Sequence, residues 1–143
     1  MRFLLDTNTI VALTRHRNVR VRDRIAQYYG AIGLSSIVIH ELAYGAFWSD
    51  RPDHHLQTID ELPFDRIDFT ESDARAAGHV RAALRRLFTT IGPYDTLIAG
   101  QALARDLTLV TNNTREFARV EGLLVEDWTA AATPPLPATQ HLR

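Results

Sequence analysis

Short apolar runs alternate with longer amphipathic stretches along most of the chain. Runs of four or five mainly apolar residues bounded by turn residues are typical of buried β-strands. They occur at residues 2–5, 31–35 and 107–111. Weaker patterns at 64–69 and 123–128 predict two further strands, the last of them at an edge of the sheet.

Helical periodicity fills the segments between these strands. Apolar positions three and four residues apart are the signature of an amphipathic helix. We predict helices at 7–14, 19–29, 37–48, 54–62 and 71–88, another that begins at Pro93, and a short helical turn at 114–120. Short strands that alternate with helices predict an α/β fold whose parallel sheet is covered by helices on both faces.

The length and composition suit a single globular domain. The chain has 143 residues, of which 45% are hydrophobic and 23% are charged, and it shows no internal repeat. We expect the domain to span residues 1–128. The segment 129–143 is rich in proline, and we expect it to be a disordered tail.

Several classes of protein are excluded by what the sequence lacks. Without cysteine there is no disulfide, no thiolate zinc site and no cysteine nucleophile. No apolar run is long enough to predict a transmembrane helix. Asp6 interrupts the N-terminal apolar run where a secretory signal needs an apolar core, so we expect a cytoplasmic protein without membrane contact.

The charge distribution leaves two interpretations open. The formal net charge is −1, and all 16 basic residues are arginines. A biased genomic base composition accounts for this choice, and so does the use of arginine to bind phosphates or acidic partners. Two arginine clusters are candidates for phosphate binding. They lie at residues 15–24 and at Arg81, Arg85 and Arg86.

An aspartate lies on the apolar face of the helix that begins at Pro93. Ile98, Ala99 and Ala102 lie three, four and seven residues after Asp95, so Asp95 shares the face that packs inward. An acid in the first turn of a helix also suits the helix dipole, and this is the simpler explanation.

Two further acids occupy comparable positions. Asp6 follows the first strand, where it also suits the N-cap of the next helix. Glu41 shares a helix face with Val38, Tyr44 and Gly45, and a carboxylate there is costly unless it is paired or binds a metal. The alternative is that Glu41 lies at the rim and its charge reaches solvent.

The expected fold brings these acids together. Helices that follow parallel strands begin at the carboxyl edge of the sheet, where ligands bind in such folds. Asp6, Glu41 and Asp95 therefore reach one crevice, where three carboxylates repel one another. A hard cation such as Mg²⁺ or Mn²⁺ removes that repulsion, activates water and neutralises charge on a phosphate.

A fourth group follows the strand at 107–111. Asn113 and Glu116 have the spacing of a helix capping box. They are equally suited to the metal site, where Asn113 binds a metal-held water and Glu116 adds a carboxylate. Thr7, Asn8 and Ser36 are further candidates for polar contacts with the acids, although Ser35 or Ser36 also suits a helix cap.

Four motifs in this order resemble the PIN-domain nucleases, and within them the VapC toxins of bacterial toxin–antitoxin pairs. They are "LLDTNTIVAL", "LSSIVIHELAYGA", "IGPYDTLIAGQALA" and "LTLVTNNTREF". The resemblance implies a three-layer α/β sandwich and an endoribonuclease that depends on Mg²⁺ or Mn²⁺. It places the acidic positions at Asp6, Glu41 and Asp95, and the variable last one at Asn113 or Glu116. Many members have aspartate where this chain has Asn113.

The resemblance also implies partners. VapC toxins commonly form homodimers and are blocked by a VapB-type antitoxin, whose C-terminal segment lies across the active-site groove. An antitoxin arginine often enters the acidic site, where a guanidinium pairs with carboxylates. Arginines of the toxin, with Arg81, Arg85 and Arg86 as candidates, would then bind the RNA phosphates.

These observations lead to a specific mechanistic hypothesis. Asp6 and Asp95 hold the metal ion, Glu41 orients or deprotonates the attacking water or helps to hold a second ion, and Glu116 tunes the site with Asn113. A haloacid-dehalogenase-type phosphatase is disfavoured, because its D-x-D pattern is replaced by "DTNT". A receiver domain is disfavoured because the chain lacks lysine. A housekeeping PIN nuclease and a non-catalytic RNA-binding or partner-binding module remain alternatives.

Overall fold

The computed structural model describes residues 1–131 and contains one five-stranded sheet in the order β3-β2-β1-β4-β5. All four neighbouring pairs are parallel. The strands are β1 (Phe3–Leu5), β2 (Ile32–Ser35), β3 (Asp65–Ile67), β4 (Thr108–Val110) and β5 (Val125–Glu126). The predicted parallel sheet is confirmed. The predicted domain boundary at 128 stays a prediction, and residues 132–143 of the predicted tail lie outside the described residues.

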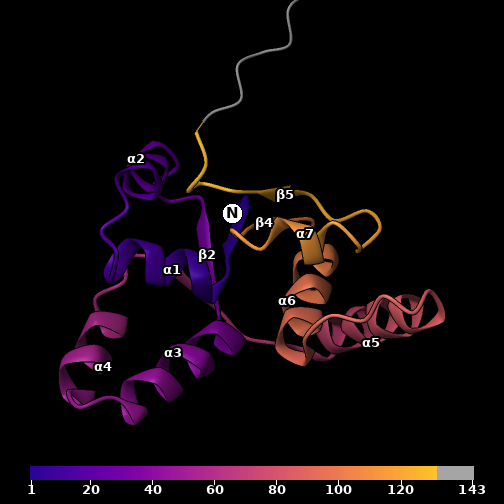
Figure 1. Cartoon of the computed structure of the whole chain (residues 1–143), viewed down its shortest axis with the longest axis horizontal. Helices are drawn as coiled ribbons and strands as arrows, with labels where there is room; N and C mark the ends of the chain where they lie inside the picture. The colour runs from indigo at the N-terminus through magenta and orange to yellow at the C-terminus, as the bar shows by residue number, and fades with distance from the viewer. Residues whose placement is uncertain (132–143) are drawn as a thin grey trace, which may run out of the picture.

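Helices cover both faces of this sheet, as predicted. They are α1 (Thr7–Thr14), α2 (Val19–Gln27), α3 (Ser36–Trp48), α4 (Pro52–Asp60), α5 (Glu71–Arg86), α6 (Pro93–Ala104) and α7 (Thr114–Phe117). Figure 1 shows α1, α3 and α4 on one side of the strands and α5, α6 and α7 on the other. The α/β three-layer sandwich is therefore confirmed. None of these helices is long and apolar enough to cross a membrane.

Local differences from the sequence predictions have simple causes. The helix predicted at 54–62 begins instead at Pro52, because proline fits the first turn of a helix, where its missing N–H costs no hydrogen bond. Ser35, not Ser36, caps α3, since its hydroxyl accepts the Ile37 N–H. The turn predicted at 114–120 ends at Phe117.

The core lies on both faces of the central strand. All three residues of β1 are fully buried, and β2 is buried along its whole length. On the face of the sheet covered by α5, α6 and α7, the helices α5 and α6 pack so closely that a Cβ on Gly100 would collide with the backbone of Ala77. This close approach requires glycine, and it fixes α6 against the helix that precedes it.

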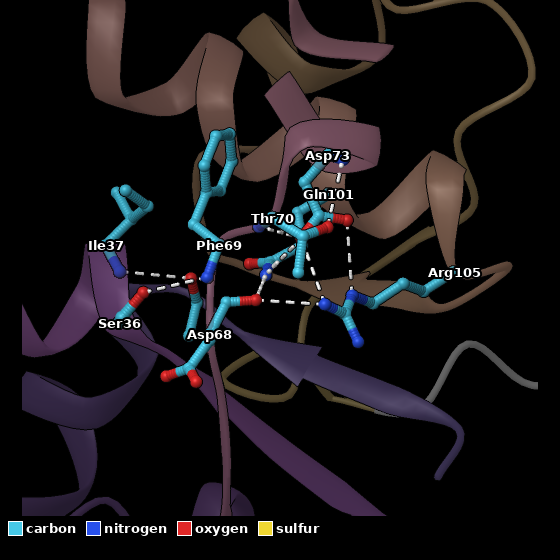
Figure 2. A network of polar contacts seen from close by, with 9 residues as sticks. Ser36, Ile37, Asp68, Phe69, Thr70, Asp73, Gln101 and Arg105 are labelled. Atoms are coloured by element: carbon cyan, nitrogen blue, oxygen red, sulfur yellow. Dashed lines mark hydrogen bonds and ion pairs between the residues drawn. The ribbon is translucent and has the colours of Figure 1, made fainter. Parts of the chain in front are cut away.

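A polar network ties the beginning of α5 to the end of α6, as Figure 2 shows. The buried carboxylate of Asp73 accepts hydrogen bonds from Nε and Nη2 of Arg105 at 3.2 and 3.0 Å, and one from the amide of Gln101 at 3.2 Å. It also accepts the backbone N–H of Thr70 at 2.9 Å, which completes a capping box. Arg105 donates a further bond to the Asp68 carbonyl at 2.9 Å. The network anchors the helix pair that carries Asp95.

The strand order creates a crevice at the carboxyl edge of the sheet. From β1 the chain proceeds to β2 and β3 on one side, and it later returns to place β4 and β5 on the other. The order therefore reverses between β1 and β4, where open α/β sheets bind ligands. Asp6 directly follows β1 and Thr111 directly follows β4, so both lie at this reversal point.

Candidate active site

Asp6 is both a helix cap and a buried acid of the crevice. Its Oδ1 accepts the Thr9 N–H at 3.0 Å as the N-cap of α1, and its Oδ2 accepts the Thr111 hydroxyl. The side chain is almost fully buried. Burial raises the pKa of Asp6, although the hydrogen bonds from Thr111 and Thr9 oppose the rise. The capping interpretation of Asp6 is correct, and it leaves the carboxylate with free lone pairs.

Thr111 is a site residue that sequence reasoning missed. It is fully buried, donates to Asp6, and accepts the backbone N–H of Asn113 at 3.0 Å. Thr111 thus links the carboxyl ends of β1 and β4. Its only trace in the sequence is a hydroxyl directly after a buried strand, a position that we treated as the end of the strand.

Glu41 lies in the second turn of α3 and is partly buried. Burial is the main cause of its raised pKa, and the charge of Asp6 adds to the rise. The face that we predicted to be apolar is open rather than packed, because Tyr44 is 67% exposed. Glu41 therefore lies at the rim and not in the core. This rim is part of the crevice that holds the acids.

The pKa of Asp95 shows the influence of the other acids. It lies in the first turn of α6, after Pro93, and is partly buried. Burial raises the pKa of Asp95 to about 6, and the negative charges of Asp6, Glu41 and Glu116 add to the rise. The charges of three other carboxylates, from different parts of the chain, thus act on Asp95; the sequence predicted Asp6 and Glu41 beside it and left Glu116 open.

Asn113 and Glu116 interact with each other, but not as a capping box. The Asn113 amide Nδ2 donates to Oε2 of Glu116 at 2.8 Å, and no side chain caps α7. The capping interpretation is therefore wrong. Asn113 instead orients Glu116, whose charge acts on Asp95.

The three additional polar candidates, Ser36, Asn8 and Thr7, lie in different environments. The hydroxyl of Ser36 accepts the backbone N–H of Phe69 at 3.1 Å, in the region shown in Figure 2, so it serves the fold and not the acids. Asn8 is exposed. The Thr7 hydroxyl is buried and lines the same groove as Glu41, and its polar contact with that carboxylate opposes the rise in the Glu41 pKa.

A groove of about 260 Å³ extends from these residues between α1, α3 and α4. Thr7 and Glu41 line it, and Arg15, His54 and His55 contribute cationic or titratable groups to the same lining. The predicted arginines Arg81, Arg85 and Arg86 are exposed on α5 and do not line this groove.

The residues present suit a divalent cation held by two carboxylates. Within residues 1–131, no three His, Cys, Asp or Glu side chains are arranged to hold one ion together. Mg²⁺ commonly takes only one or two carboxylates and keeps several waters, so Asp6 and Asp95 stay the predicted ligands. No arginine in the described part of the chain forms an ion pair with the four acids, and the buried Thr7 hydroxyl adds an oxygen at the groove.

Comparison with known proteins assigns the family. The sequence model of the PIN domain matches residues 3–123. This chain belongs to the PIN domain family. Asp6, Glu41, Asp95 and Glu116 all lie within the matched part of this PIN domain.

Individual relatives extend the similarity over nearly the whole chain. Two proteins named tRNA(fMet)-specific endonuclease VapC are similar to this PIN domain. The Shigella flexneri protein is 42% identical over 132 residues, which cover 90% of this chain and 99% of the relative. The Salmonella typhimurium protein is 39% identical over 131 residues, with 90% and 98% covered. In a crystal structure of DNA-bound VapBC from Salmonella typhimurium, one chain is 38% identical and superposes with a TM-score of 0.86, with 90% and 98% covered.

Proposed function

We propose that this PIN domain is a metal-dependent endoribonuclease and the toxin of a toxin–antitoxin pair. One observation carries the proposal: the charges of Asp6, Glu41 and Glu116 all raise the pKa of Asp95 at the carboxyl edge of a parallel sheet. Acids gathered in this way, with no arginine of residues 1–131 ion-paired to them, suit a cation and a phosphate ester. The names of the VapC relatives support the nuclease assignment.

Each acid has a distinct role in the proposed reaction. A bound Mg²⁺ or Mn²⁺ supplies a water of lowered pKa and neutralises charge on the phosphate. Asp6, held by Thr9 and Thr111, and Asp95 are the residues that would hold the ion. Glu41, whose pKa is raised, accepts a proton from the attacking water on its carboxylate, because a raised pKa makes it a better base. Asn113 orients Glu116, whose charge acts on Asp95.

The relatives suggest a first substrate to test. The proteins of Shigella flexneri and Salmonella typhimurium carry names that specify tRNA(fMet). We therefore propose initiator tRNA as the substrate of this chain, and elongator tRNAs as the comparison set. Selective cleavage of an elongator tRNA would reject the substrate while leaving the nuclease assignment in place.

The solved relatives suggest the regulatory partner. Similar structures include VapBC from Salmonella typhimurium and VapBC2 from Rickettsia felis. We propose that a VapB-type antitoxin places its C-terminal segment in the groove beside Glu41 and pairs an arginine with the acids. We further propose that the toxin forms a homodimer, which sedimentation of the purified chain tests.

The decisive experiment is cleavage of initiator tRNA by the purified chain with Mg²⁺, with Mn²⁺ and with EDTA. We expect cleavage with metal, no cleavage with EDTA, and no cleavage by Asp6→Asn. Asparagine keeps the N-cap acceptor for Thr9, so the variant should fold. Asp23→Asn, at an exposed position in α2, is the control and should cleave normally. Equal rates for Asp6→Asn and the wild type would reject the assignment.

Two outcomes favour the alternatives. RNA binding without cleavage under either metal condition indicates a non-catalytic binding module. Cleavage without growth arrest on expression, together with the absence of a neighbouring antitoxin gene, indicates a housekeeping nuclease.

A further inference from the structure

Two exposed aromatic rings, each on a residue next in the chain to a site acid, contact one another. His40 in α3 directly precedes Glu41, and Tyr94 in α6 directly precedes Asp95. Their ring centroids lie 5.4 Å apart and their planes are tilted by 42°. Because each ring is one residue from an acid, the pair is fixed in position relative to the site.

The two rings are open to solvent. Tyr94 is 47% exposed, and His40 belongs to the exposed class. A parallel stack would hide one face of each ring, whereas a tilted contact leaves ring surface available. Tyr44 is 67% exposed and lies four residues after His40, one turn along the same face of α3. An aromatic surface therefore continues from the site along α3.

We propose that His40 and Tyr94 form a stacking platform for an unpaired nucleobase beside the scissile phosphate. The inference rests on the proposed function, since it requires RNA at the acids. Unpaired bases bind proteins by stacking on exposed aromatic rings, and every base offers such a face. The four acids of this site repel the RNA backbone, so binding through the base compensates where binding through the phosphate is weak.

The position of the pair favours RNA over a protein partner. A phosphodiester at the acids carries its own sugars and bases, so a base necessarily lies near the residues that flank Glu41 and Asp95. The ring edges of His40 and Tyr94 also carry polar atoms, which suit the mixed polar and aromatic surface of a base. An occupant of protein would be expected to use the larger apolar side chains further along α3, Phe47 and Trp48, which are 69% and 83% exposed.

Steady-state cleavage of initiator tRNA with Mg²⁺ tests the platform through variants of Tyr94. We expect Tyr94→Ala to raise KM about tenfold with little change in kcat, an effect within the range of one base stacked on an aromatic ring. Tyr94→Phe should behave as the wild type, and Tyr94→Leu, which is apolar but lacks a π face, should resemble Tyr94→Ala. Tyr29→Ala, which removes a ring 73% exposed at the end of α2, is the matched control.

A double-mutant cycle locates the base. An RNA oligonucleotide that spans the mapped cleavage site is prepared with an abasic nucleotide at each flanking position in turn, and its affinity is measured in EDTA. At one position the abasic change should weaken binding to the wild type about tenfold and leave binding to Tyr94→Ala unchanged. Equal losses for both proteins at every position would overturn the platform.

The outcomes separate this inference from the proposed function. Cleavage by the wild type with an unchanged KM in Tyr94→Ala overturns the platform and leaves the nuclease standing. Absence of cleavage with a tenfold weaker affinity of Tyr94→Ala in EDTA rejects the nuclease and supports the platform. If Tyr94→Ala changes only the sedimentation or the binding of the antitoxin, the rings serve a protein interface and the inference is wrong.

Discussion

Asp73 and Asp95 are both aspartates, and they occupy the same position in two helices that pack against each other. Each is the third residue of its helix, in α5 and α6 respectively. Burial raises the pKa of both. For Asp73 the hydrogen bonds of Arg105, Thr70 and Gln101 outweigh burial, so its pKa lies below the usual value. For Asp95 the charges of other acids add to burial, and its pKa reaches about 6.

This difference separates a structural acid from a site acid. The helix dipole is comparable for both, so the partners determine the direction of the shift. Asp73 has its cation built into the fold, and its pairing joins two helices. Asp95 has no cation among its partners, and its unfavourable charge is the property that a metal site requires. The four predictions below test this contrast.

The largest expected effect follows from removing the cation of Asp73. Arg105→Met leaves the buried carboxylate of Asp73 without its cation, while Thr70 and Gln101 remain bonded to it, and should lower the free energy of unfolding by about 2–3 kcal/mol. Arg75→Met is the control, because Arg75 and Glu71 form an exposed pair in α5 that is worth about 0.5 kcal/mol or less. Urea denaturation measures both. Equal stability of the two variants would contradict a structural role for the Asp73 network.

Removing the charge of Asp95 should lower activity but raise stability. Asp95→Asn removes a proposed metal ligand and should slow RNA cleavage at least about a hundredfold, or roughly 2.7 kcal/mol of barrier. The same change removes like-charge repulsion, so the metal-free variant should melt at a higher temperature than the wild type. Cleavage rates and thermal melting in EDTA test the two halves. A lower melting temperature in EDTA would show that Asp95 has a stabilising partner.

A smaller effect is expected from the hydroxyl that holds Asp6. Thr111→Val keeps the shape of the side chain but removes the donor to Asp6 and the acceptor for the Asn113 N–H. We expect cleavage to slow about tenfold, the lower range for loss of a group that orients a metal ligand. Thr111→Ser restores the hydroxyl and should retain most of the activity. If Val and Ser variants are equally active, Thr111 does not position Asp6.

The smallest effect is a dependence of stability on pH. The pKa of Asp95 is about 6 in the folded chain, against an ordinary value of 3.8 for an aspartate, so the folded state binds more protons between these values. The wild type should therefore lose stability relative to Asp95→Asn as pH rises from about 4 to 6, with a constant difference above. Because solvent screens the charges, we expect this difference in stability to be about 1 kcal/mol or less. Melting in EDTA across this range measures it, and a difference independent of pH would refute the coupling.

Asp73 should show the opposite sign. Its folded pKa lies below the ordinary value of 3.8, so its stabilisation is complete above that pH and is lost as pH falls through the folded value. The two aspartates thus affect acid and neutral stability in separate pH windows.

Much of the fold and part of the site followed from local pattern. Buried strands of three or four residues and the helices between them leave a clear alternation in the sequence. Asp6 and Asp95 stood out because each is an acid at the end of an apolar element. The capping box at Asn113 and Glu116 was wrong, because spacing alone does not distinguish a cap from a direct contact between the two side chains.

What the sequence determined by itself is local: the alternation of elements, the start of α6 at Pro93 and the acids at strand and helix ends. Tertiary structure alone decided the pairings between distant segments. Thr111 and Asp6 are 105 residues apart in the chain, and Arg105 and Asp73 are 32 apart. Such pairs leave no periodic trace, because they depend on strand order and helix packing and not on neighbours in the chain. The different pKa values of Asp73 and Asp95 therefore arise only in the folded chain.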